Sequence, residues 1–251
     1  MSGHNKWSTI KHRKGAQDVK RGKVFTKLIK EVTVAARLGG GDPGGNPRLR
    51  AALTAARVAN MPKDNIDRAV KKGTGELEGV EYSEINYEGY GPDGVALLIE
   101  TVTDNSNRTV SEVRMVFNKR HGKMGEAGSV SWMFEQKGEV KLDKGALDFD
   151  AVFEIALESG AENVIDGGDT WNIVTSREEL YAVGAAVEAL GHEPLETALV
   201  QIPQTIVVIS DANKARRILG LVEAFEDIDD VQKVWGNFDL TDEVVAALNE
   251  E

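Results

Sequence analysis

The cationic side chains of the first 72 residues are the part of this sequence best suited to chemistry. Residues 1–72 hold 17 Lys/Arg against 5 Asp/Glu, whereas residues 73–251 hold 13 against 36. A net charge of +12 beside one of −23 predicts a protein that holds a polyanion with one end only. Lys and Arg suit this task because they release the counterions condensed on phosphates. The residues that we expect to contact a nucleic acid are Lys6, Trp7, Lys11, His12, Arg13, Lys14, Lys20, Arg21, Lys23, Lys27, Lys30, Arg50 and Arg57.

Some of these residues allow a second interpretation. Trp7 could stack on an unpaired base, a contact worth roughly 1–3 kcal/mol, or it could pack the N-terminal arm onto the helices that follow. His4 and His12 have no carboxylate or third histidine at a metal-binding spacing, so we expect no metal site. The loop GGGDPGGNPR lacks the Gly-Lys-Ser/Thr ending of a P-loop and follows no strand, which favours a hinge between helices over a nucleotide site.

The sequence argues against several classes of function. It holds no GxSxG or HExxH motif, no cysteine and four histidines, so we expect no enzyme and no cofactor. The lack of cysteine excludes disulfides and thiolate metal sites. No apolar run approaches the roughly 20 residues of a membrane span, and the charged N-terminus does not resemble a signal peptide. We therefore expect a cytoplasmic protein without a membrane partner.

The elements that would position these cations begin after a basic arm over residues 1–21. Apolar residues from Val24 to Ala36 recur at helical spacing. Lys20, Lys23, Lys27 and Lys30 recur at steps of three and four residues, which predicts a cationic stripe on another side of the same helix.

Two shorter helices follow this first one. Gly39-Gly40-Gly41 ends the first helix, and Asn46-Pro47 supplies the N-cap and first residue of a second, which shows Arg50 and Arg57 outward. A third helix begins at Pro62 and closes at Gly73. The core of this helical domain is thin, because its large apolar side chains are few.

Beyond an acidic, glycine-containing linker the periodicity becomes mixed α and β. The order strand-helix-strand-strand-helix-strand over residues 138–202 predicts a ferredoxin-like unit. The expected fold class is α+β: an N-terminal helical domain followed by two α/β-sandwich domains, the last ferredoxin-like and inserted into the middle one. The expected domains are 1–76 (arm and helices), 77–134 (middle domain, first part), 135–203 (inserted domain) and 204–251 (middle domain, second part, with an acidic tail that frays).

Three long stretches carry a family resemblance. They are SGHNKWSTIKHRKGAQDVKRGKVFTKLIKEV, NPRLRAALTAARVANMPKDNIDRAVKKG, and YEGYGPDGVALLIETVTDNSNRTVSEVRMVF with GSVSWMF. In this order they resemble the YebC family of probable transcriptional regulators, which is related to mitochondrial translational activators. The resemblance covers essentially the whole chain and implies a three-domain fold. One departure is the stretch from Lys119 to Gly125, which is more basic than expected and either adds a phosphate contact or is surface variation.

Charge and resemblance together predict a nucleic-acid-binding regulator of gene expression. The leading hypothesis is a DNA-binding transcriptional regulatory protein that acts through its basic N-terminal domain. The alternative is a ribosome-associated translation factor or translational activator that contacts ribosomal RNA. The acidic domains would repel either polyanion, so we expect them to face away from it or to bind a protein partner.

Overall fold

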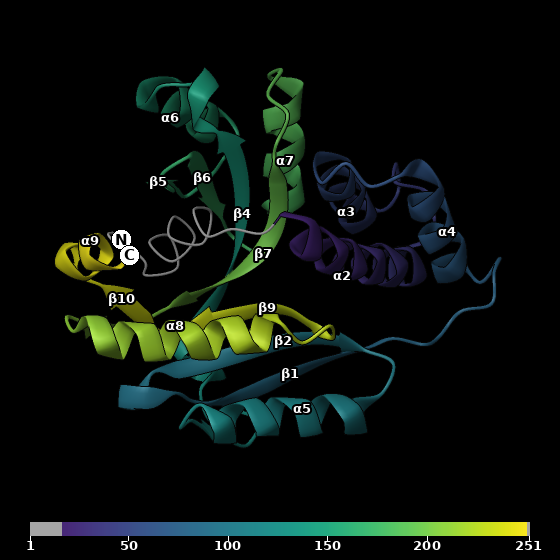
Figure 1. Cartoon of the computed structure of the whole chain (residues 1–251). Coiled ribbons are helices and arrows are strands. Elements are labelled where there is room, and N and C mark those ends of the chain that lie inside the picture. Colours follow the sequence, from purple (N-terminus) through teal and green to yellow (C-terminus); the bar gives the residue numbers. More distant parts are fainter. Residues whose placement is uncertain (1–16, 250–251) are drawn as a thin grey trace. The chain divides into compact units, whose positions relative to one another are not determined.

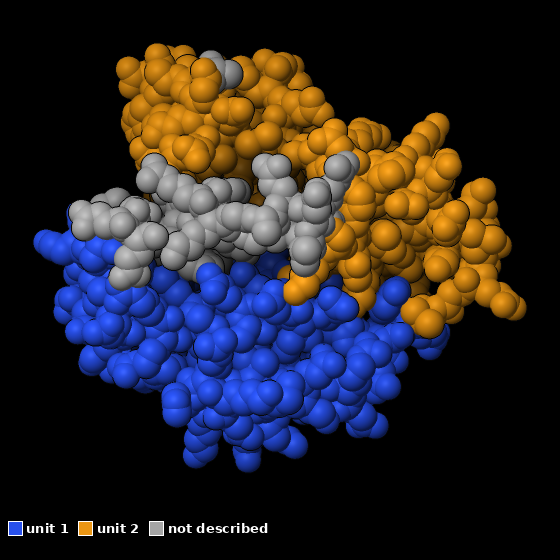
Figure 2. Space-filling model, viewed as in Figure 1, with its two compact units in different colours: residues 1–16, 81–135, 202–251 blue, residues 17–80, 136–201 orange. Residues whose placement is uncertain are grey.

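The computed structural model describes residues 17–249, with the backbone alone at 17–21, 146 and 249. Two compact units divide this part of the chain. Unit 1 contains residues 81–135 and the chain from Ile202 onward, and unit 2 contains residues 17–80 and 136–201 (Figure 2). Among the described residues, no helix combines the length and the apolar character needed to cross a bilayer.

The helical part of unit 2 consists of α2 (Gln17–Gly39), α3 (Pro47–Val58) and α4 (Lys63–Thr74), with α2 packed against both of the others (Figure 1). Their small apolar side chains form one cluster, which contains Val32, Ala35, Ala36, Leu49, Ala52, Leu53 and Ala69. Four alanines in this list confirm the expected thin core. Such a core allows close approach of the helix axes but buries little apolar surface per residue.

Asn46 fastens the end of α2 to the start of α3. Its Oδ1 accepts a hydrogen bond from the Leu49 amide (3.1 Å), and its Nδ2 donates to the carbonyl oxygens of Ala35 (2.7 Å) and Gly40 (2.8 Å). The predicted N-cap is therefore confirmed. It also ties down the glycine-rich loop, because one buried side chain satisfies three backbone groups that the two helix termini leave open.

Helix α4 continues past the residue that we expected to close it. The helix runs to Thr74, and Gly75 takes the left-handed C-cap conformation at φ 81°. Gly73 instead lies inside the helix, where a Cβ would meet the carbonyl oxygen of Thr33 and the Cβ of Ala36. The sequence contains a glycine for each role. The prediction assigned the cap to Gly73, whereas this residue permits close packing against α2.

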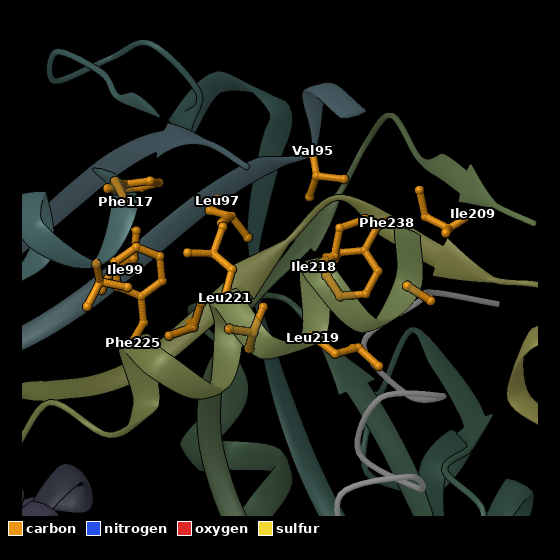
Figure 3. Close-up of a cluster of buried hydrophobic side chains, with 14 of the residues drawn as sticks. Val95, Leu97, Ile99, Phe117, Ile209, Ile218, Leu219, Leu221, Phe225 and Phe238 are labelled. Carbon is orange, nitrogen blue, oxygen red and sulfur yellow. The ribbon is translucent and has the colours of Figure 1, made fainter. Parts of the chain in front are cut away.

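The middle domain in unit 1 is a four-stranded antiparallel sheet in the order β3-β1-β2-β9. Two helices, α5 and α8, contribute to its main core with Phe117, Ile218, Leu221 and Phe225 (Figure 3). Val113 of α5 belongs to the same core. The strands are β1 (Ser83–Tyr90), β2 (Ala96–Thr103), β3 (Lys123–Met124) and β9 (Val231–Gly236); the helices are α5 (Ser106–Lys119), α8 (Ala212–Glu226) and two 3-10 turns, η1 (Pro92–Gly94) and η2 (Ser131–Met133).

Glu88 holds the loop that leads out of this sheet. Its Oε1 accepts a hydrogen bond from the Gly128 amide (2.8 Å), and its Oε2 accepts from the amides of Val130 (2.6 Å) and Ser131 (2.9 Å). Burial raises the pKa of Glu88, but the three amides outweigh it and leave the pKa below its ordinary value. A charged carboxylate thus replaces the backbone partners that a loop of this shape lacks.

The acidic tail does not fray as expected. It forms α9 (Asp242–Asn249), in which Val244 and Leu248 are buried in the middle-domain core. Their spacing of four residues places both on one helix face. Before it, β8 (Val207–Ile209) pairs in parallel with β10 (Phe238–Leu240) as a separate two-stranded sheet.

The remaining part of unit 2 has the predicted ferredoxin-like order. Its elements are β4 (Phe134–Asp143), a 3-10 turn η3 (Lys144–Ala146), α6 (Phe149–Glu158), β5 (Asn163–Asp166), β6 (Thr170–Thr175), α7 (Leu180–Ala189) and β7 (Glu196–Pro203). The sheet order is β5-β6-β4-β7. This unit interrupts the middle domain between η2 and β8, so the predicted fold class is confirmed. The domain limits at 76, 134 and 203 stay a prediction.

Candidate nucleic-acid interface

The structure bears on only part of the predicted contact set. Lys6, Trp7, Lys11, His12, Arg13 and Lys14 lie outside the described residues. Lys20 and Arg21 lie on α2, but their side chains are not described. The interface can therefore be built from Lys23, Lys27, Lys30, Arg50 and Arg57, together with cations that the prediction did not include.

The predicted cationic stripe on α2 is wrong at Lys30. This side chain is only 7% exposed, and residues 32–36 are buried without interruption. Since α2 packs against both α3 and α4, its turn from Val32 to Ala36 has no exposed side on which the stripe could continue. Lys23 and Lys27 are half-buried, and all three lysines already interact with neighbouring groups. A buried cation cannot reach a phosphate, so Lys30 is removed from the candidate interface.

The exposed cations of the helical domain lie mainly on α4. Arg68, Lys71 and Lys72 are exposed, and we call them the α4 cation set. Their spacing of three and four residues places them on one side of the helix. On α3, Arg57 is exposed and Arg50 is half-buried. Among residues 17–249, Arg57 and the α4 cation set form no ion pair. Each of these cations can therefore bind a phosphate and release the counterions condensed on it.

The sequence contained a signal for the α4 cation set that the prediction did not use. Lys71-Lys72 directly precedes Gly73, where the third helix was expected to close, and the last turn of a helix is a favourable place for cations because of the helix dipole. Both roles are compatible, since a cation that neutralises the negative end of a helix still faces solvent. Arg68 lies one turn earlier and extends the set toward the helix centre.

Arg48 has a structural role instead. Its Nε donates to Oε1 of Glu31 at 2.7 Å and its Nη2 donates to Oε2 at 3.0 Å, a bidentate pair between α3 and α2. Such fork-to-fork geometry is selective for Arg with a carboxylate. The pair neutralises one of the few acidic groups of the helical domain while it fixes α3 on α2.

The basic stretch that begins at Lys119 is also at the surface. Lys119, Arg120, His121 and Lys123 are exposed where α5 ends. Nη1 of Arg120 lies 3.6 Å from the position that a Cβ on Gly220 of α8 would occupy, so it reaches the neighbouring helix. Unit 1 therefore carries a small cationic area of its own. Its role as a phosphate contact stays a prediction.

The described residues contain no group of three or more His, Asp or Glu placed to hold a metal ion. In the turn Asp166-Gly167-Gly168-Asp169, the carboxylate of Asp166 stabilises the turn and pairs with a lysine. Oδ1 of Asp166 accepts from the Gly168 amide (2.9 Å), and its carboxylate pairs with Lys144. Lys144 and the Gly168 amide together lower the pKa of Asp166. This is the hairpin chemistry expected of an Asp before two glycines.

Comparisons with known proteins cover nearly the whole chain. Residues 5–76 match the family model described as the TACO1/YebC protein N-terminal domain, and residues 82–238 match the TACO1/YebC second and third domain. A probable transcriptional regulatory protein of Geobacter sulfurreducens is 58% identical over 99% of this chain and 100% of its own. One of Desulfosudis oleivorans is 54% identical over 97% and 99%.

A solved structure has the same fold. The crystal structure of a conserved hypothetical protein from Aquifex aeolicus aligns with a TM-score of 0.85 and 46% sequence identity. The alignment covers 91% of this chain and 95% of that protein. The order of helices and sheets described above is therefore shared with an experimentally determined relative.

Proposed function

Because the chain belongs to the TACO1/YebC family, we propose that it is a regulator of gene expression that binds DNA through its basic N-terminal domain. The printed names of its relatives, probable transcriptional regulatory proteins, support the regulatory role. The observation that carries the binding role is the placement of charge. The net +12 of residues 1–72 includes the α4 cation set and Arg57, which are exposed and unpaired among the described residues.

The physical reason is counterion release. Each phosphate neutralised on duplex DNA contributes about −0.9 to the slope of log affinity against log salt. The α4 cation set would supply about three such contacts, and thus roughly −2.7 of the slope. Cations that already pair with carboxylates, such as Arg48, release fewer counterions and contribute less.

A charge-reversal experiment tests this proposal. We expect the variant Arg68→Glu/Lys71→Glu/Lys72→Glu to bind duplex DNA more weakly, with a salt slope less negative by about 2 to 3. The matched control Arg114→Glu/Arg177→Glu/Arg217→Glu makes the same change in net charge at exposed positions outside the helical domain and outside the basic stretch that begins at Lys119. If fluorescence anisotropy gives equal losses for both variants, the effect is one of net charge and the helical domain is not the interface.

The runner-up function is a translation factor that contacts ribosomal RNA, and one feature of α4 favours it. A recognition helix reads base edges mainly with its N-terminal residues. In α4 those positions include the exposed Asp64 and Asp67, whose carboxylates oppose a close approach to phosphates. The α4 cation set lies at the other end, an arrangement suited to backbone contact without base reading.

Specificity separates the two functions. At about 150 mM salt, a transcriptional regulator should prefer its own site over random duplex by about 10³ or more. A ribosome-docking factor should bind intact ribosomes tightly and duplex DNA weakly, whatever the sequence. Preference for one promoter fragment without ribosome binding supports the DNA proposal. Tight ribosome binding without preference for any promoter fragment supports the translation factor and contradicts the DNA proposal.

A further inference from the structure

Helix α6 of the ferredoxin-like unit exposes a row of large apolar side chains. Phe149, Phe153 and Leu157 are 48%, 43% and 63% exposed. They follow one another at intervals of four residues, so they form a continuous stripe along one side of the helix. We call it the α6 stripe. Single exposed apolar residues are ordinary, but three in register on ten residues of helix indicate a contact surface.

The helix does not need this stripe for its own packing. Its buried side chains are Val152, Ile155 and Ala156, which face the sheet. The α6 stripe lies outside this packing, so only another molecule or segment bound to it would bury it. Removing this apolar surface from water would stabilise a complex, and that stabilisation is not realised in the described part of the chain.

The aromatic members of the stripe are already ordered. The rings of Phe149 and Phe153 stack with centroids 5.7 Å apart, and Phe149 meets the edge of Trp171 at the same distance. Trp171 is buried and donates from Nε1 to the carbonyl oxygen of Leu147 (2.9 Å). A partner would therefore meet rigid rings, which lowers the entropy cost of binding.

Acidic residues border the stripe on its open side. Asp150, Glu154 and Glu158 are exposed and repeat at the same interval of four residues, each one position after a member of the stripe. Two parallel rows result, one apolar and one anionic. The complementary surface has an apolar row beside a cationic one, as on a basic amphipathic helix.

This charge pattern discriminates among possible occupants. A nucleic acid would be repelled by the anionic row. A second copy of the chain, docked through its own α6, would bring carboxylates against carboxylates. We propose that the α6 stripe is a docking surface for a basic amphipathic helix of a protein partner. The partner's apolar residues cover Phe149, Phe153 and Leu157, and its Lys or Arg side chains pair with Asp150, Glu154 and Glu158.

The test uses the full chain and a defined probe. The probe is a fluorescein-labelled helical peptide of leucine and lysine with all leucines on one face. We expect it to bind the parent protein, and to bind Phe153→Ser/Leu157→Ser and Asp150→Lys/Glu154→Lys roughly tenfold or more weakly. A peptide with glutamate in place of every lysine should not bind the parent, but should gain affinity for Asp150→Lys/Glu154→Lys.

Two matched controls make the result specific. Leu38→Ser removes an equally exposed leucine from α2, and Glu178→Lys/Glu188→Lys makes the same change in net charge beside and on α7 of the same unit. Both should bind the probe like the parent, and near-UV circular dichroism should show that every variant is folded. Equal weakening by the controls, absence of binding to the parent, or self-association of the parent that Phe153→Ser/Leu157→Ser abolishes would each overturn the proposal.

This inference is independent of the proposed function. Nucleic-acid binding depends on the helical domain, so the Phe153→Ser/Leu157→Ser variant should bind duplex DNA like the parent. Conversely, the charge reversal of the α4 cation set should leave the probe's affinity unchanged. Loss of both activities in a variant that circular dichroism shows to be folded would mean that the α6 stripe and the α4 cation set belong to one binding surface, and would overturn the proposal of a separate docking surface.

Discussion

Gly73 of α4 faces the carbonyl oxygen of Thr33 on α2 so closely that no side chain fits between them. The hydroxyl of Thr33 also donates to the carbonyl oxygen of Ala69, one turn earlier on α4 (3.3 Å). The helix that carries the α4 cation set is therefore held against α2 by backbone contact, and its position depends on this glycine.

We predict that Gly73→Ala destabilises the helical domain, although alanine favours helix. The new Cβ would collide with the backbone of α2, and such overpacking typically costs about 1–3 kcal/mol. Gly22→Ala is the matched control, because nothing lies within 4 Å of its added Cβ and alanine inside a helix gains about 0.5–1 kcal/mol over glycine. Thermal unfolding should move in opposite directions for the two variants. A common direction would contradict the packing at Gly73.

The buried position of Lys30 leads to a second prediction. Lys30→Glu should lower the free energy of unfolding by about 3 kcal/mol or more, because it places an unmatched charge where the lysine is 7% exposed. Arg57→Glu, at an exposed position of the same domain, should change it by less than about 0.5 kcal/mol. Urea unfolding would measure both. Equal changes in the free energy of unfolding for the two variants would show that Lys30 is exposed, as the predicted stripe requires.

Glu88 makes stability depend on pH. Because its folded pKa lies below the ordinary value of 4.5, its stabilising contribution is present above that pH and is lost as the pH falls through the folded pKa. Glu88→Gln should cost about 1–3 kcal/mol at neutral pH, since an amide NH₂ would face a backbone N–H. The difference between parent and variant should shrink below about pH 4.5. A constant difference in urea unfolding across this range would exclude the carboxylate as its cause, and the exposed Glu126→Gln serves as control.

We also predict that residues 134–203 fold alone. All four strands of the sheet β5-β6-β4-β7 lie within this fragment, as do α6, α7 and the buried cluster around Ile173 and Leu180. Trp171 is its only tryptophan and is buried, so its fluorescence should shift on urea unfolding in a cooperative transition. A fragment without such a transition would show that the unit needs the rest of the chain.

The sequence predicted most elements because their periodicity is local. The order of strands and helices in the inserted unit, for example, followed from the alternating pattern of residues 138–202. The tail was misjudged because its acidic composition was given more weight than the spacing of Val244 and Leu248. Which of several apolar faces is buried is not a local property. Seven of the ten residues of α6 are Phe, Val, Ile, Leu or Ala, and they occupy exposed and buried positions alike, so the α6 stripe could not be found from the sequence pattern.

The candidate interface was predicted in part for the same reason. Total charge by segment is independent of packing, so the basic segment can be identified from the sequence alone; its role as the interface stays a prediction. Exposure of a single lysine depends on what covers its helix, and the sequence could not show that α2 is the central helix. Two members of the α4 cation set, Lys71 and Lys72, are adjacent in the sequence. Basic residues are common at the end of a helix, so the pair did not by itself indicate a binding surface.

The inserted unit also has a consequence for synthesis on the ribosome. Strand β9 completes the middle sheet beside β2, and the amide of Ala96 bonds to Oδ1 of Asn237, 141 residues later in the chain. The nascent chain therefore exposes an open edge of β2 while the whole ferredoxin-like unit emerges and folds. Only after β9 leaves the tunnel can that edge close, so the translation of β9 decides when the middle domain becomes resistant to aggregation.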